Sequence, residues 1–279
     1  MSKQDQILWS AGRVIRFSLH QRIQHGLLAI SVFMLILTGF PIKYAHTPWA
    51  PYVIRLFGGF GNMFLTHLVF AVLMAFSAIY HLVWLIYTFI KKGPSVEMIP
   101  TFKDFQDAFH HILYLLGIRQ ETPRYGRYSY LEKFEYYAVI WGAVVMGLSG
   151  IILWFPGLFY FLPRWAFGIA RVAHSNEAFV CMLAILMGHF FAVHFHPKVF
   201  PSSPVWWNGT MSLEQLKEEH PLEYEKLIRG HPHLQTNSPR ELSPWARSRP
   251  FICFQMALYL LVSAVLLYTF IPLFLHDLF

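Results

Sequence analysis

Histidines that lie inside apolar stretches are the residues of this chain best suited to chemistry. The chain has 15 histidines among 279 residues; His67 and His81 share one apolar stretch, and His174 and His189 share another. An ionisable side chain is costly in the hydrocarbon core of a membrane and usually has a function there. A separation of 14 or 15 residues turns an α-helix through about four turns, so each pair projects from roughly one side of its helix, about 21 to 22 Å apart.

Histidines at matching depths on two helices could bind iron between them. The stretches that carry the two pairs run in the same direction, so we expect His67 and His174 near the outer membrane surface and His81 and His189 near the inner one. Neutral imidazole suits iron, and two such helices could clamp two stacked b-type haems. His25 opens another apolar stretch and competes with His81 for the inner iron opposite His189. Depth slightly favours His81, because His25 lies only three residues from Arg22 and is therefore shallower, but the spacing leaves this choice open.

Other interpretations of these histidines lead to different functions. A single intramembrane histidine is more often a hydrogen-bonded packing residue than a metal ligand. If the histidines here are of that kind, the chain would be a membrane anchor subunit without a redox role. Histidines also line metal or proton transporters, but these usually bring acidic residues into the membrane. Here only Glu177 and Glu135 come close to the apolar stretches. The chain has no CxxCH motif, so any haem is not attached as c-type.

The composition predicts an all-α integral membrane protein. Hydrophobic residues make up 56% of the chain and charged residues 13%, about half of the proportion usual in soluble proteins. A membrane-crossing helix needs about 20 mostly apolar residues. Five stretches qualify and predict a bundle of about five transmembrane helices in one domain, with loops over residues 91–133 and 197–250. The predicted helices cover about residues 25–41, 64–90, 136–155, 172–195 and 251–274.

The positive charges predict the orientation of this bundle. Of the 22 Lys and Arg residues, 18 lie in the N-terminal segment and the two long loops, and only 4 in the two loops on the other side. Cytoplasmic loops are enriched in Lys and Arg, so we expect a cytoplasmic N-terminus and a C-terminus on the outer face. This distribution between apolar stretches accounts for the net charge of +7 without a nucleic-acid partner. A stretch over residues 104–117 has amphipathic helical spacing and is expected to lie along the cytoplasmic surface.

Several segments resemble a known family of membrane cytochromes. They cover about two-thirds of the chain and include RFSLHQRIQHG, LTGFP, FGGFGNMFLTHLVFAVLMAFSAIYHL, GRYSYLEKFEYYAVIWGAVVMGLSGIILW and AHSNEAFVCMLAILMGHFFAVHFHPKVFP, with EHPLEYEKL after the last. These segments resemble the di-haem cytochrome b subunits of bacterial respiratory complexes, the formate dehydrogenase gamma and hydrogenase cytochrome b superfamily. In detail the chain is more similar to the thiosulfate-reductase-like branch, which is paired with multihaem c-type cytochromes.

The resemblance implies a ligand set and a function. It implies one haem b on His67 and His174 and another on His25 and His189, between helices 1, 2 and 4, and leaves His81 without a role unless a third haem or a quinone uses it. The chain departs from the dehydrogenase pattern in the fourth helix, where the histidines are 15 rather than 14 residues apart. Arg22 and Arg171 lie near the membrane surfaces, where haem propionates emerge.

The implied role is electron transfer across the bacterial inner membrane. One end would meet a peripheral iron–sulfur or multihaem c-type subunit, and the other would exchange electrons with menaquinone or another quinone. The chain would then be the electron-transfer subunit of a quinone-linked oxidoreductase and not catalytic alone.

Overall fold

A computed structural model describes residues 7–8, 13–196, 199–200, 202–231 and 249–276 of the chain. Within these residues four helices are long and apolar enough to cross a membrane, which confirms the first four predicted spans. The fifth predicted span corresponds to the apolar helix α10 (Arg249–His276). The four spans are α1 (Leu19–Lys43), α3 (Phe60–Lys92), α5 (Tyr130–Trp154) and the continuous segment formed by α6 (Arg164–Leu183) and η2 (Ala184–Phe195).

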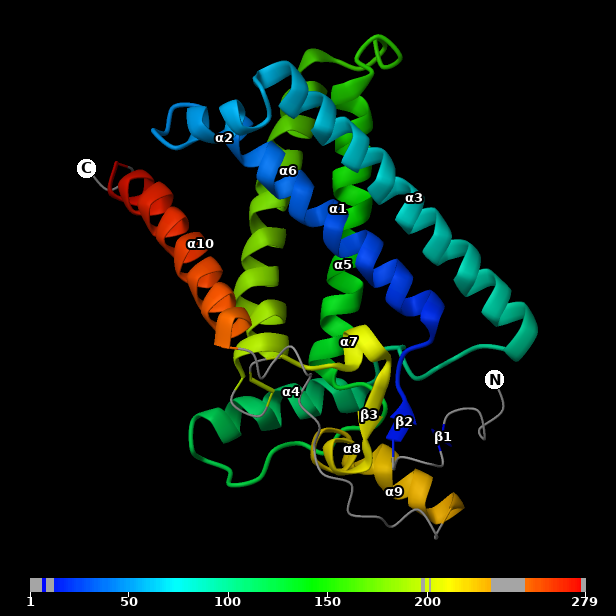
Figure 1. Ribbon diagram of the computed structural model, residues 1–279. Coiled ribbons are helices and arrows are strands. Elements are labelled where there is room, and N and C mark those ends of the chain that lie inside the picture. Colours follow the sequence, from blue (N-terminus) through cyan, green and yellow to red (C-terminus); the bar gives the residue numbers. More distant parts are fainter. Residues whose placement is uncertain (1–6, 9–12, 197–198, 201, 232–248, 277–279) are drawn as a thin grey trace.

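The spans pack as two helix pairs. The helix α1 lies along α3, and α5 lies along α6, whereas direct contacts between the two pairs are sparse (Figure 1). Small or polar side chains fill the tightest places within the spans, among them Ser31, Thr38, Ser77 and Ser149. Small residues allow helices in a membrane to approach closely. The helices within each pair are therefore closely packed, whereas few residues of one pair contact the other pair directly.

The beginnings of α1 and α5 are fixed by the same local motif. Ser18 accepts a hydrogen bond from the backbone N–H of Gln21, and the Gln21 side chain returns to the backbone of Ser18. Ser129 and Glu132 form the same reciprocal capping box at the start of α5. A capping box satisfies N–H groups that the first helical turn leaves unpaired. Both helices thus begin at defined residues several positions before the predicted starts at 25 and 136.

A small layer of strands and short helices lies at the end of the bundle where α1 and α5 begin, and its sheet was not predicted. The positive charges predict that this end is cytoplasmic, so we call it the inner end and the opposite end the outer end. The strands β1 (Ile7–Leu8), β2 (Arg13–Ile15) and β3 (Thr210–Ser212) form an antiparallel sheet. The helices α7 (Val205–Asn208), α8 (Leu213–Glu219) and α9 (Pro221–Gly230) follow in the loop predicted over residues 197–250. Residues 197–198, 201 and 232–248 of that loop lie outside the described part of the chain.

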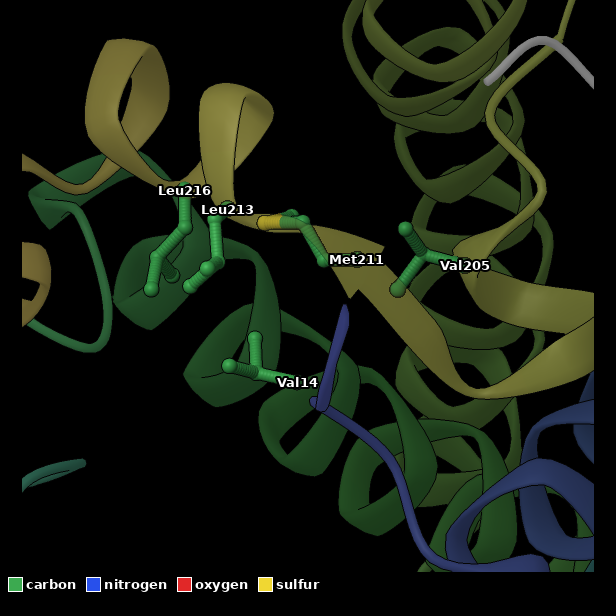
Figure 2. Close-up of a cluster of buried hydrophobic side chains, with 5 residues drawn as sticks. All are labelled: Val14, Val205, Met211, Leu213 and Leu216. Atoms are coloured by element: carbon green, nitrogen blue, oxygen red, sulfur yellow. The ribbon is translucent and has the colours of Figure 1, made fainter. Parts of the chain in front are cut away.

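The inner layer has its own hydrophobic core, shown in Figure 2. It consists of Val14, Val205, Met211, Leu213 and Leu216, each at most 6% exposed. The sheet pairs Arg13 with Ser212, which are far apart in the sequence. Three-residue strands with such distant partners have too little periodic pattern to be predicted locally. The layer joins the segment before α1 to the segment after η2.

Buried ions also hold this layer together. Arg16, only 3% exposed, donates to Glu223 and to the carbonyl oxygen of Arg127 (2.6 Å), and Arg127 also donates to Glu223 (2.7 Å). The Nε2 atom of His220 lies 3.2 Å from the Arg16 guanidinium, and its Nδ1 lies 2.8 Å from the carbonyl oxygen of Gly126. Because a guanidinium can only donate, Nε2 accepts and Nδ1–H donates. Burial, assisted by the Arg16 charge, lowers the pKa of His220 below its ordinary value.

Two further helices lie outside the spans. The short helix α2 (Ala50–Leu56) lies in the connection between α1 and α3. The helix α4 (Phe102–Leu115) lies between α3 and α5 and confirms the amphipathic helix predicted over residues 104–117.

Candidate functional site

Two predicted ligands face each other near the outer end of the bundle. The ring centroids of His67 on α3 and His174 on α6 are 6.4 Å apart, with an angle of 67° between the ring planes. The rings come from different helix pairs and meet where direct contacts between the pairs are sparse. The sequence-based pairing of His67 with His174 agrees with this arrangement.

The orientation of both outer rings follows from one hydroxyl on each neighbouring helix. Thr38 on α1 donates to the carbonyl oxygen of Met34 (2.7 Å), so its single proton is used and it accepts from Nδ1–H of His67 (2.9 Å). Ser149 on α5 likewise donates to the Val145 carbonyl oxygen (2.6 Å) and accepts from Nδ1–H of His174 (3.0 Å). In each neutral imidazole the proton therefore lies on Nδ1. The lone pair of Nε2 is left to bind a metal.

A glycine follows each of these hydroxyl residues and makes room for the ring. A Cβ atom on Gly39 would lie 3.1 Å from Cε1 of His67, and one on Gly150 would lie 3.2 Å from Cε1 of His174. Both distances are shorter than ordinary contacts between carbon atoms, which are about 3.5 to 4 Å. By contrast, a Cβ on Gly147 would meet nothing within 4 Å. Of these glycines, Gly39 and Gly150 therefore have a specific role in the close approach of the histidine rings.

A second pair of histidines lies near the inner end of the bundle. The ring centroids of His25 on α1 and His189 on η2 are 6.1 Å apart, with an angle of 54° between the planes. Nδ1 of His189 lies 3.0 Å from the Glu135 carboxylate on α5. A carboxylate accepts, so Nδ1 carries the proton and Nε2 is again free. The inner pair thus has a charged hydrogen-bond partner where the outer pair has neutral hydroxyls.

His81, the alternative inner ligand, is engaged elsewhere. Its Nδ1 lies 2.8 Å from Oε1 of Gln24 on α1, and its Nε2 lies 2.9 Å from the hydroxyl of Tyr136 on α5. Both ring nitrogens are therefore in hydrogen bonds that join α3 to α1 and α5. The structure brings His25, and not His81, to His189.

The π-helical segment η2 accounts for the unusual spacing in the fourth span. His174 and His189 are 15 residues apart, and in a regular α-helix this spacing overshoots four turns by about 60°. The expectation of α-helix throughout residues 172–195 was wrong, because the chain becomes π-helical at Ala184. A π turn closes its hydrogen bond one residue later than an α turn, so it absorbs an extra residue. His189 consequently points as it would at a spacing of about 14 residues in an α-helix.

The separation of the rings fits one iron between each pair. A bond of about 2 Å from a metal to each imidazole nitrogen, with about 1.1 Å from nitrogen to ring centroid, places opposed centroids about 6 Å apart. Haem iron needs two axial ligands at most from the protein, whereas zinc usually needs three or four. Within the described residues no group of three or more His, Cys, Asp or Glu side chains could hold a metal ion. The two facing pairs therefore suit haem better than a bare metal ion.

The predicted arginines lie one turn from a histidine in each case. Arg22 precedes His25 on α1 and donates to the carbonyl oxygen of Trp207 (2.6 Å). Arg171 precedes His174 on α6 and is exposed. His194 lies on η2, with Nδ1 2.7 Å from Nε2 of Gln255 on α10.

Several residues around the rings were not singled out from the sequence. They are Thr38, Ser149, Gln24 and Tyr136, none of which is an unusual residue in a membrane helix. One signal was present: a hydroxyl residue followed by glycine occurs near the outer ends of both α1 and α5, as Thr38–Gly39 and Ser149–Gly150. The repetition of that pair could have pointed to the outer rings.

Comparisons with known proteins agree with this geometry. A family model described as prokaryotic cytochrome b561 matches residues 16–203, more than half of the chain. The chain is also 29% identical over 98 residues to the formate dehydrogenase cytochrome b556(fdo) subunits of Escherichia coli strains K12, O6:H1 and O157:H7. The match covers 34% of this chain and 39% of each relative. The chain therefore belongs to the prokaryotic cytochrome b561 family, which makes it a multi-pass haem b protein of electron transport in the bacterial inner membrane.

Proposed function

We propose that this chain transfers electrons across the membrane between two haem b groups. One would be held by His67 and His174 near the outer face and the other by His25 and His189 near the inner face. The observation that carries this proposal is the presence of two facing histidine pairs, each with the ring separation that suits one bridging iron. Along the helices the two pairs are about 20 Å apart.

Hydrogen bonds to neighbouring side chains orient three of these histidines so that Nε2 is available to iron. Thr38 and Ser149 hold the protons on Nδ1 of the outer rings, and Glu135 does so for His189. A partner on the second ring nitrogen fixes the orientation of a ligating histidine and increases its basicity. A haem held by these histidines would supply one-electron transfer, at a potential set by the histidines and their hydrogen bonds. The charged Glu135 makes the inner ligand set more electron-rich than the outer set.

The partners at each end belong to the same proposal. The relatives are named as subunits of formate dehydrogenase, which supports an association of this chain with a peripheral redox subunit. We propose an iron–sulfur or multihaem c-type subunit at the outer end and exchange of electrons with menaquinone or another quinone at the inner end. Arg22 and Arg171, one turn from His25 and His174, are our candidates for binding haem propionates.

Haem quantification in single variants tests the ligand assignment. Purified protein should show a reduced-minus-oxidised α-band near the wavelength typical of b-type haem and bind two haems. Replacement of His25, His67, His174 or His189 by alanine should each remove about one haem. The matched control is His81→Ala, which removes an intramembrane histidine of similar depth and should retain both haems.

Other outcomes would favour other functions. Absence of a haem spectrum from purified protein would favour a non-redox membrane anchor, and ion uptake into liposomes without a haem spectrum would favour a transporter. Loss of the inner haem in His81→Ala but not in His25→Ala would overturn the inner assignment.

A further inference from the structure

The helix α4 has an apolar face with no protein against it among the described residues. Its exposed large side chains recur on one side at helical spacing, and each is between 52% and 76% exposed. They are Phe102, Phe105, Phe109, Ile112, Leu115 and Leu116. We call these six residues the α4 stripe. Soluble surfaces rarely leave so large a continuous apolar area in water.

The chain connectivity keeps α4 at one membrane surface. Short connections join it to the end of α3 at Lys92 and to the start of α5 at Tyr130. Both of these spans cross the membrane, so α4 must lie at the face where α3 ends and α5 begins. Figure 1 shows α4 lying across the foot of the bundle, transverse to the spans. The helix thus lies at the level where the spans α3 and α5 leave the membrane.

The polar side of α4 fixes its rotation. Asp104 accepts a hydrogen bond from Lys133 on α5 (2.9 Å), and His111 is bonded to the Tyr130 hydroxyl (2.8 Å). Burial acts to raise the pKa of Asp104, but hydrogen bonds from Lys133 and Thr101 outweigh it and hold the pKa below its usual value. The carboxylate therefore stays charged at neutral pH, and the attachment to α5 persists. With α5 on this side, the stripe cannot turn into the bundle.

We propose that the α4 stripe is inserted into the lipid leaflet and anchors the inner layer of the protein to the membrane surface. An amphipathic helix with a strongly apolar face binds at the boundary between headgroups and acyl chains. The exposed Arg119, just beyond the C-terminal end of α4, complements phospholipid phosphates. Lipid is favoured over a protein partner because α4 lies at the level where α3 and α5 leave the membrane. This inference does not depend on the proposed haem ligands.

Site-directed spin labels test this proposal in the full chain. In a background where Cys181 and Cys253 are replaced by serine, single cysteines are introduced as Phe105→Cys and Phe109→Cys on the stripe. The matched controls on the polar side are Lys103→Cys and Gln106→Cys. Each labelled protein is placed in nanodiscs of phosphatidylcholine with phosphatidylglycerol, without any partner. Accessibility to oxygen and to a water-soluble nickel chelate is then measured by power saturation.

The stripe labels are expected to collide at least several-fold more with oxygen than with the nickel chelate, and the control labels should show the opposite preference. Equal aqueous accessibility at all four positions would overturn the proposal and leave the stripe as a surface for a protein partner. The haem spectrum of each variant reports separately on the proposed electron-transfer function. A variant with intact haem and an aqueous stripe would reject the membrane anchor alone.

Discussion

At the scale of single residues, the two histidine pairs differ mainly in what holds their Nδ1 protons. The outer rings donate to neutral hydroxyls, whereas His189 donates to the carboxylate of Glu135. A negative charge behind an axial imidazole favours the more positively charged ferric state. The difference between a hydroxyl and a carboxylate should therefore be visible in the reduction potentials.

The variant Glu135→Gln tests this difference. It keeps a hydrogen-bond acceptor for His189 but removes the charge, so the midpoint potential of the inner haem should rise by tens of millivolts. Redox titration of the α-band measures both haems in one experiment. The control Ser149→Ala removes a neutral partner of the outer pair and should leave the inner potential unchanged. An unchanged inner potential in Glu135→Gln would contradict the assigned ligand environment.

Glycines at the outer rings allow a second test at this scale. Gly150→Ala introduces a Cβ about 3.2 Å from Cε1 of His174, so the ring must move and the outer haem should be lost or its spectrum altered. Gly147→Ala is the matched control on the same helix, since its Cβ meets nothing within 4 Å. Alanine is favoured over glycine in a helix by about 1 kcal/mol, so the control should keep both haems. Equal haem content in the two variants would argue against a close fit at Gly150.

At the scale of elements, the change from α6 to η2 decides where His189 points. The π-helical residues occupy the part of the span between the two histidines and beyond His189. Segments of this kind are frequent at functional sites, where they rotate the residues that follow. Here the rotation compensates for one additional residue between His174 and His189.

Changing the length of this segment tests that compensation. Deletion of Met187, an exposed residue of η2, gives a spacing of 14 and should convert the preceding turn to α-helix while His189 keeps its direction. Both haems should then be retained. Insertion of one alanine after Met187 increases the spacing and should cost the inner haem but not the outer one, as measured by haem content. Loss of the inner haem in the deletion variant as well would count against a compensating role of the π-helix.

At the scale of the whole molecule, the inner layer links the start of α1 to the end of η2. Its sheet pairs residues before α1 with residues after η2, and its buried ions join the segment between β2 and α1 to the segment before α5 and to α9. His25 and His189 lie on α1 and η2, the two spans connected by this layer. The layer therefore constrains the segments that carry the inner histidine pair.

The buried His220 makes the stability of this layer depend on pH. Its pKa is lower in the folded protein than the value of about 6.5 expected when unfolded, so the unfolded state binds more protons between these two values. Stability should be complete above about pH 6.5 and decrease as the pH falls towards the folded pKa. Protonation of Nε2 would break its bond with Arg16 and bring two positive charges together.

Hydrogen exchange measures this effect directly. Amides of β2, β3 and α8 should exchange faster at pH 5.5 than at pH 7.5 after correction for the intrinsic rate, while those of α5 should not. The control His220→Asn cannot be protonated in this range and should lack the pH-dependent step. Equal pH dependence in the two proteins would show that another group is responsible.

The membrane class, the approximate position of the spans and the candidate histidines could all be predicted from the amino-acid sequence. Long apolar stretches and charges between them are local properties, and the cost of burying an ionisable group in lipid makes each intramembrane histidine visible. His67, His174 and His189 were therefore found from depth and spacing. The ends of the spans were predicted to within two residues, whereas their starts were placed up to eight residues too late. The orientation of the bundle remains a prediction from the charges.

Which histidines face each other depends on how the helices pack, and this could not be predicted from the sequence. Depth slightly favoured His81 over His25, but the structure brings His25 to His189, because the direction of a ring depends on the rotation of its helix. Nδ1–H of His81 donates to the amide oxygen of Gln24, and its Nε2 is hydrogen-bonded to the Tyr136 hydroxyl, so both nitrogens of His81 are engaged. The π-helical segment turns His189 towards His25. Contacts between distant segments and a local change of helix type set these directions. The spacing of apolar residues along the chain reveals neither these contacts nor the change of helix type. Both depend on how the four spans pack.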